Sequence, residues 1–275
     1  MFDYHVHTEF SVDCMTPMRD SCEAAIAAGV TEIAFTDHVD HEPLDPGRGY
    51  YLPEAYFRSL NAVREEYAGR LVVLAGAEVD FNERTMPLVE HFMQEWGPQY
   101  DFVIGSVHYG IDGEIIFGEY FRNRTLAEIY PAYFRELTLA ASTGWFDTLG
   151  HLDLPKRYAP RSHRTYDPLE FKPDLDRLFA TMAANDVAFE INTSGLRQGP
   201  KASMPGPAIV RWYADAGGKL ITTGTDSHIP RTVGAGLPET LDMLRLCGIT
   251  EVASFRNRQA TLRPIDDLRP AHSLA

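Results

Sequence analysis

The sequence predicts a parallel β-sheet that is closed, or nearly closed, into a (β/α) barrel of about seven strands. Strand-like and helix-like segments alternate along the 275 residues, as they do in proteins built from βα units. The strand-like segments are almost continuously apolar, which is typical of a sheet covered on both faces. Six of them place a histidine or an acidic residue at or near their carboxyl end. That distribution favours the rim of a barrel over an open, doubly wound sheet, whose functional groups gather at one switch point.

Seven short apolar segments are predicted to be strands, and seven longer segments are predicted to be helices. The predicted strands cover residues 2–6, 32–36, 71–75, 101–107, 146–150, 187–191 and 219–223. The predicted helices cover residues 17–28, 53–68, 86–96, 126–142, 175–185, 207–216 and 238–247. Proline in the first turn, as at Pro17 and Pro53, and glycine after the last turn, as at Gly29 and Gly144, mark the helix ends.

The composition indicates one large domain that does not bind nucleic acid. Apolar residues make up 44% of the chain, enough for a single core. We therefore expect one domain over residues 1–275, with a peripheral tail from about residue 264 to residue 275. The 25 basic and 39 acidic residues give a formal net charge of −14, which repels phosphate backbones. Such a chain needs metals or a few well-placed arginines to handle phosphate.

The cysteines and the amino terminus predict a cytoplasmic protein. Cys14, Cys22 and Cys247 are few, odd in number and without a pattern, as expected for reduced thiols. Asp3 and Glu9 lie where a signal peptide needs an apolar run. No apolar segment approaches the length needed to cross a membrane. We expect no membrane or nucleic-acid partner, and a monomer or small homo-oligomer.

Metal-ligating residue types recur where the predicted strands end. His5 and His7 have i, i+2 spacing at the end of the first strand, so both imidazoles project from one face and can share a cation. An isolated pair of this kind is more often a simple strand cap, but the later strand ends repeat the pattern. The full set is His5, His7, Asp13, Asp37, His38, Glu78, His108, His151, Glu190, Asp226 and His228. Imidazole and carboxylate ligands without cysteine favour Zn, Fe or Mn. So many candidates indicate several metals, and clustered metals are typical of hydrolysis.

These residues also form a series of short motifs. In chain order the motifs are His5-x-His7, Thr36-Asp37-His38, Glu78, Ser106-Val107-His108, Gly150-His151 and Asp226-Ser227-His228. With them, the chain resembles the polymerase and histidinol phosphatase (PHP) superfamily over nearly its whole length. The resemblance implies a distorted seven-stranded (β/α) TIM-like barrel that forms a single PHP-type hydrolase domain with a trinuclear metal centre.

The resemblance further implies how three divalent metals are held. The first metal takes His5, His7, Glu78 and Asp226, the second shares Glu78 and adds His108 and His151, and the third takes Asp13, His38 and His228. Some relatives carry histidine where this chain has Asp13. A carboxylate still binds metal there, but it adds negative charge and can alter which metal is preferred.

Within the superfamily, the chain is similar to the histidinol-phosphatases. The supporting segments are Asp3-Tyr4-His5-Val6-His7-Thr8, Gly150-His151-Leu152-Asp153 with Lys156-Arg157-Tyr158, and Glu190-Ile191-Asn192-Thr193-Ser194-Gly195-Leu196-Arg197. This similarity implies a phosphoric monoester hydrolase that converts L-histidinol phosphate to L-histidinol and phosphate in histidine biosynthesis. Our hypothesis for the mechanism is in-line attack on phosphorus by a hydroxide that bridges the first two metals, with Glu78 and Asp226 as the catalytic carboxylates.

Four further residues are candidates for contacts with this small-molecule substrate. Arg197 is expected to clamp the phosphate, because guanidinium presents a planar fork to oxyanions, and Arg157 is a second candidate. His41 is a candidate donor of the leaving-group proton, and Asp153 is the alternative, between which the sequence does not choose. Glu190 is expected either to orient a ligand histidine or to hold the substrate amine.

Two alternative functions stay open. The first is a PHP-type phosphoesterase that acts on another small phosphate ester or on a nucleotide. The acidic composition, without interleaved aromatic and basic residues, argues against polynucleotides. The second is a non-catalytic PHP binding module, which predicts eroded ligands. Every expected ligand position is filled here, which favours the enzyme.

Overall fold

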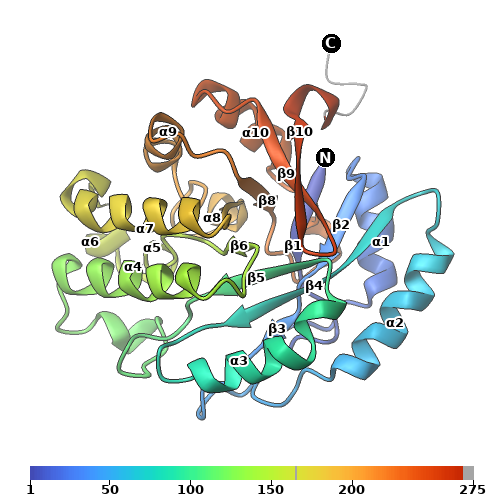
Figure 1. Cartoon of the computed structure of the whole chain (residues 1–275), viewed down its shortest axis with the longest axis horizontal. Helices are drawn as coiled ribbons and strands as arrows, with labels where there is room; N and C mark the ends of the chain where they lie inside the picture. The colour runs from blue at the N-terminus through green and yellow to red at the C-terminus, as the bar shows by residue number, and fades with distance from the viewer. Residues whose placement is uncertain (165, 269–275) are drawn as a thin grey trace.

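The computed structural model describes residues 1–164 and 166–268, and its sheet consists of parallel strands (Figure 1). The strands run in the spatial order β1-β2-β4-β5-β6-β7-β8. They are β1 (Phe2–Val6), β2 (Glu32–Phe35), β4 (Val72–Asp80), β5 (Phe102–Ser106), β6 (Thr148–Leu149), β7 (Ala188–Asn192) and β8 (Ile221–Gly224). Each of the seven predicted strands overlaps one of these, so the predicted strand count is confirmed.

Hydrogen bonds between the first and last strands nearly close this sheet into a barrel. Val6 and Ser227 form a parallel bridge, in which the His7 backbone N–H donates to the Ser227 carbonyl oxygen at 2.9 Å. Nearer the start of β1, the Thr223 hydroxyl donates to the Phe2 carbonyl oxygen at 2.9 Å. The predicted barrel is therefore confirmed, and the carboxyl ends of its strands share one rim.

Strand β4 distorts the barrel because it has two partners along the same edge. The first half of its nine residues pairs with β2. The second half pairs with the short strand β3 (His38–Val39), which places His38 opposite Glu78. The extra length of β4 therefore carries Glu78 to the level of the rim, beside the loop that follows β2.

Helices lie on the outside of the barrel (Figure 1). The seven predicted helices correspond to α1 (Met18–Ala27), α2 (Pro53–Glu66), α3 (Met86–Glu95), α4 (Leu126–Ser142), α7 (Lys172–Ala184), α9 (Pro207–Asp215) and α10 (Leu237–Leu246). Three short helices, α5 (Pro155–Tyr158), α6 (Arg161–Arg164) and α8 (Ser194–Arg197), follow β6 and β7. Apolar side chains from strands and helices form one buried cluster. Within the described residues, no helix combines the length and apolar character needed to cross a membrane.

An antiparallel hairpin that the sequence analysis did not predict covers the amino-terminal end of the barrel. Its strands are β9 (Glu251–Arg256) and β10 (Gln259–Pro264). They are joined by Asn257 and Arg258, which both have positive φ, as in the two-residue turns that fit the twist of hairpins. The usual sequence signals of such turns are Asn-Gly and Asp-Gly. Because this turn is Asn-Arg, the sequence analysis did not predict the hairpin.

The hairpin turn attaches to the barrel through buried acidic residues. Arg258 pairs with Asp147 and donates to the Trp145 carbonyl oxygen at 2.6 Å. Arg256 pairs with Glu32 at 2.6 Å. Both acids precede or begin barrel strands, so these ion pairs hold the hairpin against the strand starts.

The segment after the hairpin is described as far as residue 268. Ile265 and Leu268 are buried and anchor it to the core, whereas Pro264, Asp266 and Asp267 are exposed. The expectation of a peripheral tail stays a prediction. Residues 269–275 lie outside the described part of the chain.

We expect Arg258→Ala to lower the free energy of unfolding by about 2–3 kcal/mol, because it leaves the buried Asp147 carboxylate without its cation. Urea denaturation followed by circular dichroism measures this loss. The matched control is Arg122→Ala, whose exposed pair with Glu119 should contribute less than about 1 kcal/mol. Equal losses from the two variants would contradict the role given to the hairpin turn.

Candidate metal centre

Glu78 lies at the centre of the rim, and its two oxygens face different histidines. Its Oε1 accepts a hydrogen bond from the Ser106 hydroxyl at 2.6 Å and lies 3.0 Å from His151 Nε2. Its Oε2 lies 2.9 Å from His38 Nδ1 and 3.3 Å from His5 Nε2. The Glu78 side chain is 1% exposed. A buried carboxylate with both oxygens turned to separate imidazole groups is placed to bridge two cations.

The two other predicted carboxylate ligands lie on the far side of the same group. Asp226 Oδ1 is 3.5 Å from His7 Nε2 and 3.7 Å from His228 Nδ1. Asp13 Oδ2 is 3.1 Å from His228 Nε2 and 3.8 Å from His38 Nε2. The structure therefore brings residues from both ends of the chain together at the mouth of the barrel.

The spacing of these atoms is that of ligands around shared cations. Ligand atoms that bind one cation at about 2.1 Å lie about 3.0–3.4 Å apart. The Nε2 atoms of His5 and His7 are 3.1 Å apart, and those of His108 and His151 are 3.3 Å apart. Glu78 Oε2 is buried without a hydrogen-bond donor among the described residues. Both observations fit divalent cations.

Four groups of three side chains have ligand atoms within 4.8 Å of one another. They are His5, His7 and Glu78; Glu78, His108 and His151; His7, His38 and His228; and His38, Asp40 and His108. The first three groups overlap the three ligand sets that the family resemblance implies. The fourth contains Asp40, which the sequence analysis did not single out.

Hydrogen bonds behind the histidines select which ring nitrogen faces the centre. His5 Nδ1 donates to Glu190 Oε1 at 2.7 Å, because an ionised carboxylate only accepts. The Ser11 hydroxyl donates to Asp37 at 2.7 Å and accepts from His7 Nδ1 at 3.0 Å. In both histidines Nε2 is therefore the nitrogen that faces Glu78, as in metal sites whose ligands are oriented by a second layer of groups.

Asp80 is a functional residue that the sequence analysis missed. The His108 backbone N–H donates to Asp80 Oδ1 at 3.0 Å, and His108 Nδ1 lies 3.2 Å from the same oxygen. Asp80 follows Glu78 by two residues on β4, so both side chains project from the same face. That i, i+2 spacing was the available signal. Asp80 thus orients His108 as Glu190 orients His5.

The backbone around the site is strained and closely packed. His151 and Asp226 have φ angles of 23° and 52°, which cost roughly 1–3 kcal/mol each in residues other than glycine. The His151 backbone N–H is held by Glu190 Oε2 at 2.8 Å. Gly224 must be glycine, because a Cβ there would lie 2.4 Å from the Cβ of His5 and 2.3 Å from Glu190 Oε1. The fold thus holds the ligands in place against local strain.

Electrostatics favour ionised carboxylates in the centre. Burial opposes a charge on Glu78, but the surrounding histidines hold its pKa well below its usual range. Burial likewise opposes a charge on Asp226, and Arg157 holds the pKa of that carboxyl well below its usual range. Burial would lower the pKa of His38, but Glu78 raises it to about 9. A metal at His38 must therefore displace a proton and is expected to bind less well as the pH falls.

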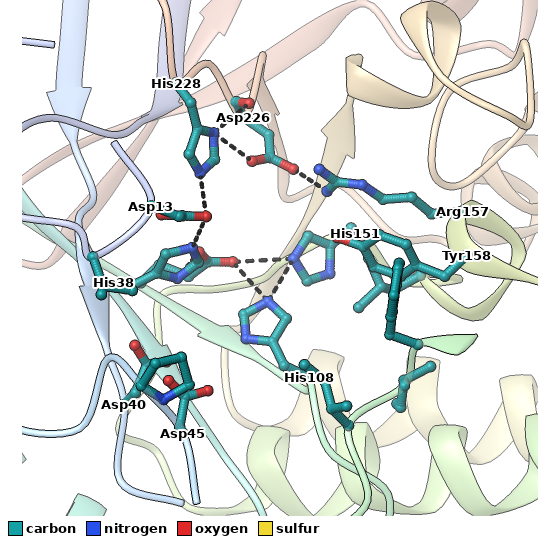
Figure 2. A pocket seen from close by; sticks show the side chains of 17 residues that line it. Asp13, His38, Asp40, Asp45, His108, His151, Arg157, Tyr158, Asp226 and His228 are labelled. Atoms are coloured by element: carbon teal, nitrogen blue, oxygen red, sulfur yellow. Dashed lines mark hydrogen bonds and ion pairs between the residues drawn. The ribbon is translucent and has the colours of Figure 1, made fainter. Parts of the chain in front are cut away.

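The rim encloses a cavity of about 320 Å³ (Figure 2). Its ligand-bearing wall consists of Asp13, His38, Glu78, His108, His151, Asp226 and His228. Arg157, from α5, pairs with Asp226 and is the one arginine or lysine among the described residues that line the cavity. Figure 2 shows Arg157 on the side opposite Asp40 and Asp45. The arginine that lines the cavity and these two acidic side chains therefore lie on opposite sides of it.

Three of the predicted substrate contacts do not line this cavity. The Arg197 guanidinium donates to the Thr225 carbonyl oxygen at 2.6 Å and lies 3.3 Å from the Thr193 hydroxyl. The His41 ring packs against Phe92, with ring centroids 5.9 Å apart. Backbone and hydroxyl oxygens accept hydrogen bonds from the Arg197 guanidinium, whereas Arg157, the second candidate for the phosphate clamp, lines the cavity. Of the two roles considered for Glu190, its contacts match the orientation of a ligand histidine.

Comparison with known proteins identifies the family of this chain. The model of the PHP domain matches residues 3–194. The chain belongs to the PHP domain family. Two curated members with which it aligns are a probable histidinol-phosphatase of Deinococcus radiodurans, 34% identical over 94% of this chain and 97% of the relative, and the histidinol-phosphatase of Lactococcus lactis, 30% identical over 92% and 93%.

A solved PHP-family structure has the same fold. It is histidinol phosphate phosphatase from Lactococcus lactis in complex with zinc, L-histidinol and phosphate. The two structures align with a TM-score of 0.86 and 26% identity, over 94% of this chain and 98% of the other. The distorted barrel described above is therefore the PHP fold.

We expect Glu190→Gln to reduce metal affinity by roughly 10- to 100-fold, because the ionised partner that orients His5 is lost. Metal titration of the purified variant, monitored by metal analysis after dialysis, measures this change. Glu54→Gln on the exposed face of α2 is the matched control and should bind metal like the unaltered protein. Full metal retention in Glu190→Gln would contradict the role given to Glu190.

Proposed function

We propose that this chain is a metal-dependent histidinol-phosphatase that hydrolyses L-histidinol phosphate to L-histidinol and phosphate. The observation that carries the proposal is one cavity in which candidate ligands for several cations meet a partly buried arginine. The proposal is further supported by the similarity to histidinol-phosphatases over more than nine-tenths of the chain. A phosphate monoester needs this combination of cations and a guanidinium, because its oxygens are strongly negative.

We propose three metals, held by the residue sets that the family resemblance implies. The donor set of imidazoles and carboxylates suits Zn, Fe or Mn, and zinc in the solved relative supports zinc. Divalent cations supply Lewis-acid activation of water and neutralise phosphoryl oxygens. Glu78 and Asp226 would hold these cations with one or both carboxylate oxygens. Asp226 can do so with Oδ1 while its Oδ2 stays paired with Arg157.

Arg157 is the residue that we propose to bind the phosphate. One guanidinium nitrogen donates to Asp226, which fixes the plane of the fork. The Nε atom is buried and has no hydrogen-bond partner among the described residues. A buried donor without an acceptor is unfavourable, and a phosphate oxygen in the cavity would satisfy it. Arg157 would thus position the ester and stabilise the charge on its oxygens.

The apolar part of the cavity wall would take the organic part of the substrate. It includes Val12, Ile115, Phe117 and Tyr158, which are also partly open to solvent. The rings of Phe117 and Tyr158 meet edge to face, with centroids 5.3 Å apart. Such a wall accommodates a planar imidazole and limits access of water to the reacting groups.

The other expectations about the whole protein stay predictions. All three cysteines are free and buried, which agrees with reduced thiols in a cytoplasmic protein. We also propose that the chain acts as one domain, without nucleic acid, and as a monomer or small homo-oligomer.

The proposed function predicts that the purified protein releases phosphate from L-histidinol phosphate. Removal of metal with a chelator should abolish the release, and added Zn²⁺, Mn²⁺ or Fe²⁺ should restore it, because the reaction depends on the cations. Phosphate release is measured before and after metal removal, alongside a nucleoside monophosphate as a competing ester. A preference for the nucleotide would overturn the substrate assignment, and chelator-resistant turnover would overturn the metal dependence.

We expect Arg157→Lys to raise the KM for L-histidinol phosphate by about 10-fold or more, with metal content unchanged, because a single ammonium cannot reproduce the two-pronged contact of a guanidinium. Steady-state kinetics and metal analysis measure the two quantities. Arg161→Lys, on the neighbouring short helix α6, is the matched control. Unaltered kinetics in Arg157→Lys would remove Arg157 from the phosphate site.

A further inference from the structure

Three consecutive apolar residues of the cavity wall come from one irregular segment, residues 108–121, which lies between β5 and α4 and is called the arch below. They are Ile115, Ile116 and Phe117. The Ile116 backbone N–H donates to the His108 carbonyl oxygen at 2.8 Å. The chain therefore leaves the metal centre at His108, turns at a tip and folds back beside its own start. The return places the three apolar residues at the cavity.

The start of the arch is attached to the barrel independently of its tip. The Asn82 side-chain amide donates to the Tyr109 and Gly110 carbonyl oxygens at 3.3 and 2.9 Å. The His108 backbone N–H donates to Asp80 Oδ1 at 3.0 Å. These bonds come from β4 and the loop after it. We therefore expect His108 to keep its place in the metal centre when contacts at the tip are lost.

One guanidinium, that of Arg124, bonds to the arch on both sides of the apolar residues. Arg124 donates to Asp112 Oδ2 at 2.5 Å and to Glu114 Oε2 at 2.8 Å, and both acids precede the apolar residues. It also donates to the carbonyl oxygen of Tyr120, which follows them, at 2.5 Å. The guanidinium lies over the Tyr120 ring, 4.5 Å from its centroid. A single side chain thus connects the two ends of the apolar stretch.

Tyr120 connects Arg124 to the cavity wall. The Tyr120 side chain is buried, and its backbone N–H donates to the Phe117 carbonyl oxygen at 3.1 Å. Its ring lies so close to Gly110 that a Cβ there would be 2.6 Å from a ring carbon. The Phe117 ring in turn meets Tyr158 across the cavity wall. The position of Phe117 therefore depends on Tyr120, which Arg124 holds from outside the cavity.

We propose that Arg124 is a positioning residue that holds residues 115–117 against the cavity and so makes the site select phosphate esters with a ring in their organic part. This inference rests on the proposed function, which supplies such an ester. A single surface ion pair contributes little to stability, but a network of several charges contributes more. Here two carboxylates, a carbonyl oxygen and an aromatic ring of one segment share one guanidinium. The metals and the phosphate do not touch this network.

The experiment compares L-histidinol phosphate with O-phosphoethanolamine, which keeps the aminoethyl phosphate part of the substrate and lacks the imidazole. Arg124→Ala should raise the KM for L-histidinol phosphate by about 5- to 20-fold, with kcat changed by less than about threefold, because contacts with the apolar wall are lost. The inhibition constant of O-phosphoethanolamine, measured as a competing ester, should change by less than about threefold. Metal content should be unchanged.

Arg122→Ala is the matched control, because Arg122 lies two residues away and forms an exposed pair with Glu119. It should leave both constants unaltered. A second variant, Asp112→Asn with Glu114→Gln, keeps Arg124 and removes its two carboxylate partners. It should raise the KM for L-histidinol phosphate in the same direction. Combined with Arg124→Ala, it should raise the KM no further than Arg124→Ala does alone, because these residues act as one network.

Backbone hydrogen exchange provides a readout that needs no turnover. In Arg124→Ala, exchange should become about 10-fold faster or more in peptides that cover residues 108–121, and it should be unchanged in β4. A merely structural role would instead lower the free energy of unfolding and weaken both esters alike. Equal losses on the two esters, an unchanged KM, loss of metal, or unaltered exchange in the arch would overturn the inference.

Failure of the proposed function is distinguishable from failure of this inference. If the unaltered protein releases no phosphate from L-histidinol phosphate, the proposed function fails. Calorimetric binding of L-histidinol and of ethanolamine to the metal-loaded protein then replaces the kinetic comparison. Weaker binding of L-histidinol alone in Arg124→Ala, together with faster exchange in the arch, would still support the role of Arg124, and equal changes for both alcohols would overturn it.

Discussion

A carboxylate buried among imidazoles is the interaction on which this structure depends. Glu78 is almost completely removed from water, and its oxygens lie about 3 Å from nitrogens of His38 and His151. Charge in such a place is stable only when opposite charge is close to it. The imidazoles supply that charge when they carry protons, and cations supply it when the imidazoles are neutral. The rim of the barrel is therefore arranged to hold positive charge at one point.

The residues behind this centre determine its geometry. Glu190, Asp80 and the Ser11–Asp37 pair each accept a hydrogen bond from a ligand histidine or from its hydroxyl partner. They come from different strands and loops, so each histidine is fixed by a separate part of the barrel. This arrangement resists the strain in the backbone of the ligand-bearing loops, and it limits each ring to one rotation and one tautomer.

The charges around the cavity are separated in space. Arg157 lies on one side of the metal ligands and Asp40 lies on the other. Arg157 is prominent because it is the one arginine or lysine among the described residues that line the cavity.

The sequence by itself determined the alternation of strands and helices and indicated the candidate metal ligands, because buried strands and metals each demand particular residue types that are visible locally. The sequence could not determine which arginine faces the cavity, because it does not distinguish Arg157 from Arg197. Only the packing of the folded chain shows that carbonyl and hydroxyl oxygens occupy the Arg197 guanidinium. Such contacts join residues far apart in the chain, and they exist only once the barrel has closed.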